Sequence, residues 1–171
     1  SGLVGSEMCI RDRNNGTINA SAGDNWEYLN PFLDSGDNTE ITNNGTISLN
    51  YGVSGGKGNN KVFRMTNGIG QSFTNSIGAS VTAIGLNNLP GGMIQDDNTT
   101  VTNNGTFTIG GNGTSQQAIK YYETADGQTL INTGTLTQSG STDAILNEGT
   151  NAVITNTGTI NGATHDINNT C

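Results

Sequence analysis

The chain has 171 residues, a formal net charge of −8, and only 31% hydrophobic and 5% aromatic residues. Its 26 glycines, 26 asparagines and 25 threonines make up 45% of the sequence. Six Lys and Arg residues without a basic stripe argue against nucleic-acid binding. No apolar run reaches the roughly 18 residues of a membrane-spanning helix.

The first thirteen residues differ from the rest of the chain. They read SGLVGSEMCIRDR, contain no Asn or Thr, and hold one of the two cysteines, Cys9 and Cys171. This string resembles translated sequencing-adapter DNA at the end of a fragmentary gene. Aligning Gly16 with the later repeat glycines places Asp12 and Arg13 where other copies have Ile-Thr or Val-Thr. We therefore expect residues 1–13 to be a non-native artefact or disordered, and residues 14–171 to be one domain truncated at both ends.

A short tract recurs throughout residues 14–171. Its copies read NNGTI at 14–18, ITNNGTI at 41–47, VTNNGTF at 101–107, LINTGTL at 130–136 and ITNTGTI at 154–160. The glycines of successive copies lie 29, 60, 29 and 24 residues apart. Recurrence at roughly 20 to 30 residues is typical of stacked-repeat architectures rather than of ordinary globular domains.

Each copy alternates apolar and polar residues, which indicates a half-buried strand. Asn-Asn-Gly or Asn-Thr-Gly interrupts the strand with a sharp bend, because Asn and Gly tolerate the left-handed region. A tight β-hairpin is the alternative interpretation of Asn-Gly between strands. The long repeat spacing and the short strand arms favour instead a right-handed, single-stranded parallel β-helix. We expect about five to six coils of 24–30 residues, each with three short strands.

Stacked coils place equivalent residues about 4.8 Å apart. The inward asparagines of the repeats would then form a ladder of side-chain amides, and an inward polar residue is acceptable only if it is paired in this way. The predicted structural residues are Asn14, Gly16, Asn43, Gly45, Asn103, Gly105, Asn132, Gly134, Asn156 and Gly158.

Two parts of the chain depart from the repeat. Residues 21–38 form an insertion that contains Trp26, Tyr28, Pro31 and Phe32, which we interpret as a packed loop or a carbohydrate-stacking platform. The gap between Gly45 and Gly105 equals about two coils, so residues 51–98 are interpreted as coils with a degraded motif. Strands are expected at 62–65, 72–74, 79–84 and 93–94.

Many parallel β-helices act on polysaccharides, so paired acids in this chain are candidate catalytic residues. Asp96 and Asp97 are similar to the paired carboxylates of polygalacturonases, which could act as general acid and base. The other motifs of that family are absent, and His165 is the only histidine. The four basic residues after position 13 do not lie in an acidic cluster, as a lyase would require: Lys57, Lys61, Arg64 and Lys120. We expect no enzymatic activity, no cofactor and no metal.

Two binding sites remain as alternatives. Asp34, Asp37 and Glu40 lie within seven residues and could bind calcium, although solvated loop acids are the simpler interpretation. Thr106-Phe107-Thr108 and Thr135-Leu136-Thr137 suggest an ice-binding threonine array. That array looks short, because the corresponding tracts continue to Ser48 and Asn161.

The repeats at 41–47 and 144–160 resemble those of autotransporter passenger domains and other secreted β-helix adhesins of Gram-negative bacteria. The resemblance covers most of residues 14–171. It implies export through the outer membrane by a C-terminal β-barrel that this sequence lacks, display at the cell surface, and a role in adhesion or aggregation. The implied partners are host or neighbouring-cell surfaces, with glycan as a candidate ligand and self-association of the domain as a further expectation. The alternative function is a fragment of a carbohydrate-active hydrolase or lyase that uses Asp96 and Asp97.

Overall fold

A computed structural model describes residues 11–21, 31–34, 36–51, 61–85, 90–111 and 116–170. These residues form three parallel sheets of six strands each. The first sheet contains β1 (Arg11–Asn14), β4 (Glu40–Asn43), β7 (Ser72–Asn75), β10 (Thr100–Asn103), β13 (Thr129–Asn132) and β16 (Val153–Asn156). The second contains β2 (Thr17–Ser21), β5 (Thr46–Asn50), β8 (Ser80–Ile84), β11 (Thr106–Ile109), β14 (Thr135–Gln138) and β17 (Thr159–Asn161). The third contains β3 (Phe32–Asp34), β6 (Phe63–Met65), β9 (Gly92–Ile94), β12 (Ile119–Tyr121), β15 (Ile145–Asn147) and β18 (Ile167–Asn169).

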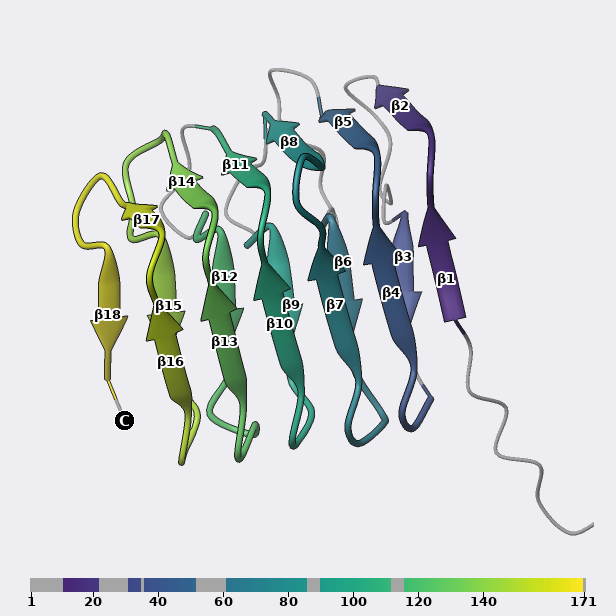
Figure 1. Ribbon diagram of the computed structural model, residues 1–171. Coiled ribbons are helices and arrows are strands. Elements are labelled where there is room, and N and C mark those ends of the chain that lie inside the picture. The colour runs from purple at the N-terminus through teal and green to yellow at the C-terminus, as the bar shows by residue number, and fades with distance from the viewer. Residues whose placement is uncertain are drawn as a thin grey trace, which may run out of the picture.

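The chain visits the three sheets in turn, so three consecutive strands make one rung of a β-solenoid. Rung 1 is β1 to β3 and rung 6 is β16 to β18. In Figure 1 the chain ascends on the near side, descends on the far side and advances to the left, which makes the coil right-handed. All strand pairs among the described residues are parallel, so the β-hairpin alternative is excluded.

The expected strands of the irregular region are confirmed as β6 to β9, and they belong to regular rungs. One detail differs from the prediction. The register pairs Glu40 with Ser72, so 32 residues separate rungs 2 and 3, which exceeds the expected 24–30. The excess lies in the connection from β5 to β6, where twelve residues separate the strands, against seven between β8 and β9. The bend between β7 and β8 is also longer, because four residues separate these strands instead of the two between β4 and β5.

The inward side chains form apolar columns that run along the solenoid. In the first sheet the column consists of Ile41, Phe73, Val101 and Leu130, all buried. Phe73 stacks on Phe63 of the third sheet with ring centroids 4.3 Å apart. Phe107 of the second sheet meets both rings edge-on at 6.2 and 6.1 Å, so this trio joins the three sheets in the core.

An asparagine ladder lies beside the apolar columns, as the repeat predicts. The Nδ2 of each asparagine donates to the Oδ1 of the asparagine in the next rung, over 2.8, 2.9, 2.8, 2.8 and 2.8 Å. The ladder includes one residue that the repeat did not identify. Its members are Asn14, Asn43, Asn75, Asn103, Asn132 and Asn156. The interior members are buried, whereas Asn156 is exposed in rung 6.

The repeat glycines sit at bends, as expected, but for a different reason from the one proposed. None of them has a positive φ. A Cβ on Gly45 would instead overlap the carbonyl oxygen of Gly16, and a Cβ on Gly134 would overlap that of Gly105. From Gly45 onwards, each repeat bend lies so close to the preceding rung that only glycine leaves room for the backbone of that rung.

Residues with a positive φ, in the left-handed region, form a column at the corner between the third and first sheets. Their φ values lie between 53° and 72°, and consecutive rungs place them one above another. They are Asn38, Gly70, Asn98, Gly127 and Asn151. Each of Asn38, Gly70, Asn98 and Gly127 donates its backbone N–H to a carbonyl oxygen of the following rung over 2.8 to 3.1 Å. This corner is therefore bonded from rung to rung like the sheets themselves.

The leading segment joins the solenoid at its end. Arg11, Asp12 and Arg13 form β1 with Asn14, opposite Glu40, Ile41 and Thr42. The first sheet thus begins before the predicted boundary after Arg13, and Asp12 stands in register with the apolar column but is exposed. Residues 1–10 lie outside the described residues. Within the described ranges, no helix is long and apolar enough to cross a membrane.

Candidate functional site

The outward face of the second sheet carries two columns of hydroxyl side chains. The first column consists of the first residue of each second-sheet strand, directly after the bend from the first sheet. Its members are Thr17, Thr46, Ser80, Thr106, Thr135 and Thr159. The second column lies two residues further along each strand: Ser48, Thr82, Thr108 and Thr137, flanked by Asn19 and Asn161. All of these residues are exposed or half-buried. The face is polar, and neither column contains a charged residue.

The geometry of this face is regular in two directions. Neighbouring rungs are about 4.8 Å apart, and alternate residues of a strand are about 6.6 Å apart. Ser80 Oγ donates weakly to Thr46 Oγ1 over 3.4 Å. The other column hydroxyls make no side-chain hydrogen bond within the described residues, so their donors and acceptors face solvent.

The sequence suggested a shorter array than the structure shows. It identified the threonines of β11 and β14 but not Ser80 and Thr82, because the bend before β8 lacks the Asn-Gly signature. The alignment of Ser72–Asn75 with the repeat would have revealed them. The hydroxyl columns therefore continue through rung 3 without a gap.

The candidate acid pair lies in the connection between β9 and β10, and its two carboxylates serve different rungs. Asp96 accepts hydrogen bonds from the backbone N–H groups of Asn67 and Gly68, over 2.8 and 2.9 Å. Asp97 accepts from the backbone N–H of Asp126 at 2.9 Å. Both acids thus fasten turns of the neighbouring rungs, an arrangement that accounts for their position without catalysis.

Asp126 continues this row of turn-binding acids. Its Oδ1 accepts from the hydroxyl of Thr150 and the side-chain amide of Asn151, both over 2.8 Å. These bonds, that of Asn151 first, lower the pKa of the Asp126 carboxyl. Asp37 acts in the same way, because its Oδ1 accepts from the backbone N–H of Ile69 at 2.9 Å.

The proposed calcium ligands do not converge. Asp37 binds Ile69, and Glu40 forms an exposed ion pair with Arg11 at 3.3 Å. The side chain of Asp34 lies outside the described residues, as do Trp26 and Tyr28 of the insertion. Among the side chains that the structure describes, no three His, Cys, Asp or Glu residues are grouped so that they could hold a metal ion.

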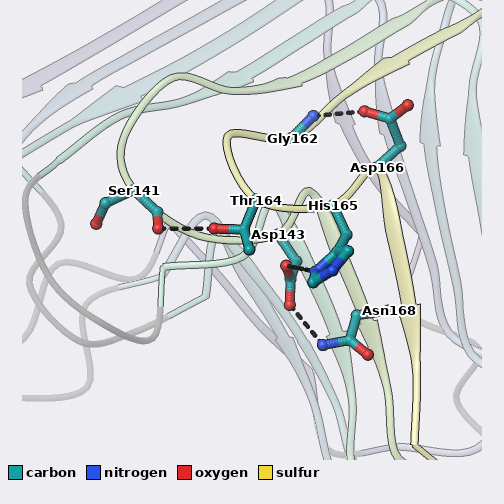
Figure 2. Close-up of polar contacts among 7 residues, drawn as sticks. All are labelled: Ser141, Asp143, Gly162, Thr164, His165, Asp166 and Asn168. Atoms are coloured by element: carbon teal, nitrogen blue, oxygen red, sulfur yellow. Dashed lines mark hydrogen bonds and ion pairs between the residues drawn. The ribbon is translucent and has the colours of Figure 1, made fainter.

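The single histidine belongs to a polar cluster between rungs 5 and 6, at the connection from the second to the third sheet. Figure 2 shows Asp143 between His165 and Asn168. The Asp143 carboxylate contacts His165 Nδ1 and accepts from Asn168 Nδ2, both over 2.8 Å. Thr164 donates to the carbonyl of Ser141 at 3.1 Å. His165 and the pair Asp96–Asp97 lie beyond opposite ends of the third-sheet strands, so they do not form one site.

The candidate lyase bases are likewise dispersed. Arg64 donates to Gln95 at 3.2 Å, and Lys120 forms an ion pair with Glu148 at 3.0 Å and lies over the ring of Tyr122. Lys61 is fully buried, and burial, with a smaller effect of the Arg64 charge, lowers its pKa to about 8. Lys57 lies outside the described residues. Arg64 and Lys120 thus contact different partners, Gln95 and Glu148.

No protein-family model, curated protein or solved structure matches the chain.

Proposed function

We propose that the chain is a non-enzymatic, extended surface adhesin or stalk segment, exported to the cell surface as in autotransporter passengers. Two features support this proposal. The acids singled out for catalysis, Asp96 and Asp97, bind backbone N–H groups of adjacent rungs. The interior asparagines of the repeat bind one another in the ladder.

The observation that carries the proposal is the pair of hydroxyl columns on the second sheet. A solenoid face of this kind repeats one weak contact many times, so its affinity comes from the sum of contacts rather than from one pocket. Each hydroxyl can donate one hydrogen bond and accept two. An uncharged partner rich in hydroxyl groups, such as a surface glycan of a host or neighbouring cell, has the complementary chemistry.

The binding face is tested by replacing hydroxyl groups with methyl groups of the same shape. The triple variant Thr82→Val, Thr108→Val, Thr137→Val removes the centre of the second column. The matched control, Thr74→Val, Thr102→Val, Thr155→Val, makes the same change on the outward face of the first sheet. Beads coated with each protein are assayed for attachment to immobilised glycans and to cells. We expect the first variant to lose attachment and the control to retain it.

Two results would contradict the proposal. Equal attachment by both variants would remove the second sheet as the binding face. Release of new reducing ends from pectin-like or other polysaccharides would support the enzymatic alternative. The export part is tested separately in the gene, by reading the coding sequence on both sides for an export signal and a C-terminal barrel domain.

A further inference from the structure

The structure separates one Asn-Gly pair from the others. The sequence has six such pairs, of which Asn112-Gly113 lies outside the described residues. In four of the remaining five, the glycine N–H donates to a side-chain oxygen. Gly16 donates to Asn14 at 3.1 Å, Gly45 to Asn43 at 3.2 Å, Gly68 to Asp96 at 2.9 Å and Gly162 to Asp166 at 2.9 Å. The N–H of Gly105 makes no hydrogen bond within the described residues.

Gly105 lies next to the longer bend of rung 3. In rungs 5 and 6 the bend glycines, Gly134 and Gly158, donate to the carbonyl of the ladder asparagine one rung earlier, both over 3.1 Å. The corresponding acceptor for Gly105 is the carbonyl of Asn75, which instead accepts only from Asn104 N, at 2.8 Å. Gly105 packs against Ser76 and Ala79 of the wider bend. Within the described residues, the nitrogen of Gly105 has no acceptor.

The side chain of Asn104 also differs from that of its counterpart in rung 2. Asn44 is held at both ends, because its Nδ2 donates to Asn15 at 2.9 Å and its Oδ1 accepts from Ser76 at 2.6 Å. Asn104 Oδ1 accepts from the hydroxyl of Thr133 at 2.8 Å, but its Nδ2 makes no hydrogen bond within the described residues. A hydroxyl that donates to the amide oxygen stabilises negative charge that develops there when the carbonyl is attacked.

We propose that Asn104-Gly105 is a site of spontaneous deamidation in the folded protein. The Gly105 nitrogen loses its proton and attacks Cγ of Asn104, so that an N–Cγ bond forms. The Cγ–Nδ2 bond then breaks, and ammonia leaves with the proton. Water opens the resulting succinimide at either carbonyl and yields aspartate or isoaspartate. No oxidant or reductant is needed.

The product changes the bend between β10 and β11. Aspartate retains an acceptor for the Thr133 hydroxyl but adds a negative charge. Isoaspartate also routes the main chain through the side-chain carbon, which lengthens the backbone where Gly105 packs closely against rung 3. The sequence alone does not single out this position, because residues 42–46 and 102–106 have the same sequence, TNNGT.

This identity provides the internal control. The folded full chain is incubated at mildly alkaline pH, digested, and analysed by mass spectrometry for aspartate and isoaspartate at each Asn-Gly pair. We expect Asn104 to react at least about fivefold faster than Asn44, the factor expected from one additional hydrogen bond. In denaturant the two positions should react at equal rates, because only the fold distinguishes them.

Variants complete the test. Asn104→Thr creates the Asn-Thr-Gly bend of rungs 5 and 6 and should fold normally while abolishing the fast reaction. Thr133→Val should slow it, because the carbonyl loses its hydrogen-bond donor. Equal rates at Asn44 and Asn104 in the folded protein, or no reaction at Asn104, would overturn the proposal. Persistence of the fast product in the Asn104→Thr variant would do the same.

Discussion

Gly70 leaves the space that the side chain of its neighbour Asn38 occupies. The two residues stand at the same corner of successive rungs, both with positive φ, and a Cβ on Gly70 would lie 2.7 Å from Asn38 Oδ1. The same relationship recurs two rungs on, where a Cβ on Gly127 would lie 2.8 Å from Asn98 Oδ1. Left-handed asparagine and glycine thus alternate, and each glycine makes room for the amide of the rung before it.

The first prediction concerns this corner. Gly70→Ala should destabilise the fold by about 1–2 kcal/mol, because a residue with a Cβ is strained at positive φ and because the methyl group crowds Asn38. Gly78→Ala is the matched control, since Gly78 has a φ of 76° but open space around its Cβ. Urea unfolding should show the larger loss for Gly70→Ala, and adding Asn38→Gly should remove the difference. Equal losses would show that crowding is unimportant.

The second prediction concerns the asparagine ladder. Asn75→Ala should cost about 2–3 kcal/mol, because it breaks the bonds to Asn43 and Asn103 and leaves the buried Oδ1 of Asn103 without its donor. Asn156→Ala should cost well under half as much, because Asn156 is exposed and joins a single neighbour. Urea midpoints of the two variants give the comparison. A similar loss in both would mean that burial does not strengthen the ladder.

The third prediction concerns the acid pair. Asp96→Ala should lower stability by about 1 kcal/mol, since two backbone N–H groups lose their acceptor. Asp12→Ala removes an exposed carboxylate that makes no polar contact within the described residues, and it should be neutral. Thermal unfolding measures the stability, and reducing-end assays measure polysaccharide cleavage. Cleavage by the wild type that is lost in Asp96→Ala would identify a catalytic acid instead.

The fourth prediction concerns pH. The folded-state pKa of Lys61, about 8, lies below its ordinary value of 10.5, so between these values the unfolded chain binds the additional proton. Stability should therefore rise with pH from about 8 to 10, by at most about 1.4 kcal/mol per unit. Burial raises the pKa of Tyr51 and Tyr121 above the ordinary value of 10.0, so the gain should reverse above that pH.

The control for this pH dependence is Lys61→Met, which keeps the length of the side chain without the charge. Its stability should stay nearly constant between pH 8 and 10, and at pH 7 it should exceed that of the wild type. Urea midpoints measured across this range provide the test. A rise in stability that persists in Lys61→Met would assign the effect to another group.

The repeat tracts predicted both the fold and the ladder positions, because stacking requires the same residue types at equal places in every rung. Asn75 was missed because Asn-Ser-Ile-Gly replaces the Asn-Asn-Gly bend, although Ser72–Asn75 follows the pattern of Thr100–Asn103. The alternation of apolar residues still predicted β7 and β8. The alternation of apolar residues thus identified the strands on both sides of the altered bend, whereas the search for the Asn-Asn-Gly tract did not identify Asn75.

The corner and the turn-binding acids could not be predicted in the same way. Asn38 and Asn98 share the tripeptide Asp-Asn-Thr, but Gly70 lies in Ile-Gly-Gln, so the three positions become equivalent only once the register of the sheets is known. The bonds of Asp96 to Asn67 and Gly68 join residues 28 and 29 positions apart. From sequence, Asp96 and Asp97 look like a pair of neighbouring acids, whereas the fold directs them to different rungs.

The asparagine ladder also gives the amides a common orientation. Every Nδ2 donates in the same direction along the solenoid, so the amide dipoles add instead of cancelling. Rotating a single interior amide by half a turn would bring oxygen against oxygen on one side and nitrogen against nitrogen on the other. One residue cannot reverse alone, and its orientation is a collective property of the column. The ladder thus gives the solenoid a chemical polarity that is independent of the direction of its strands.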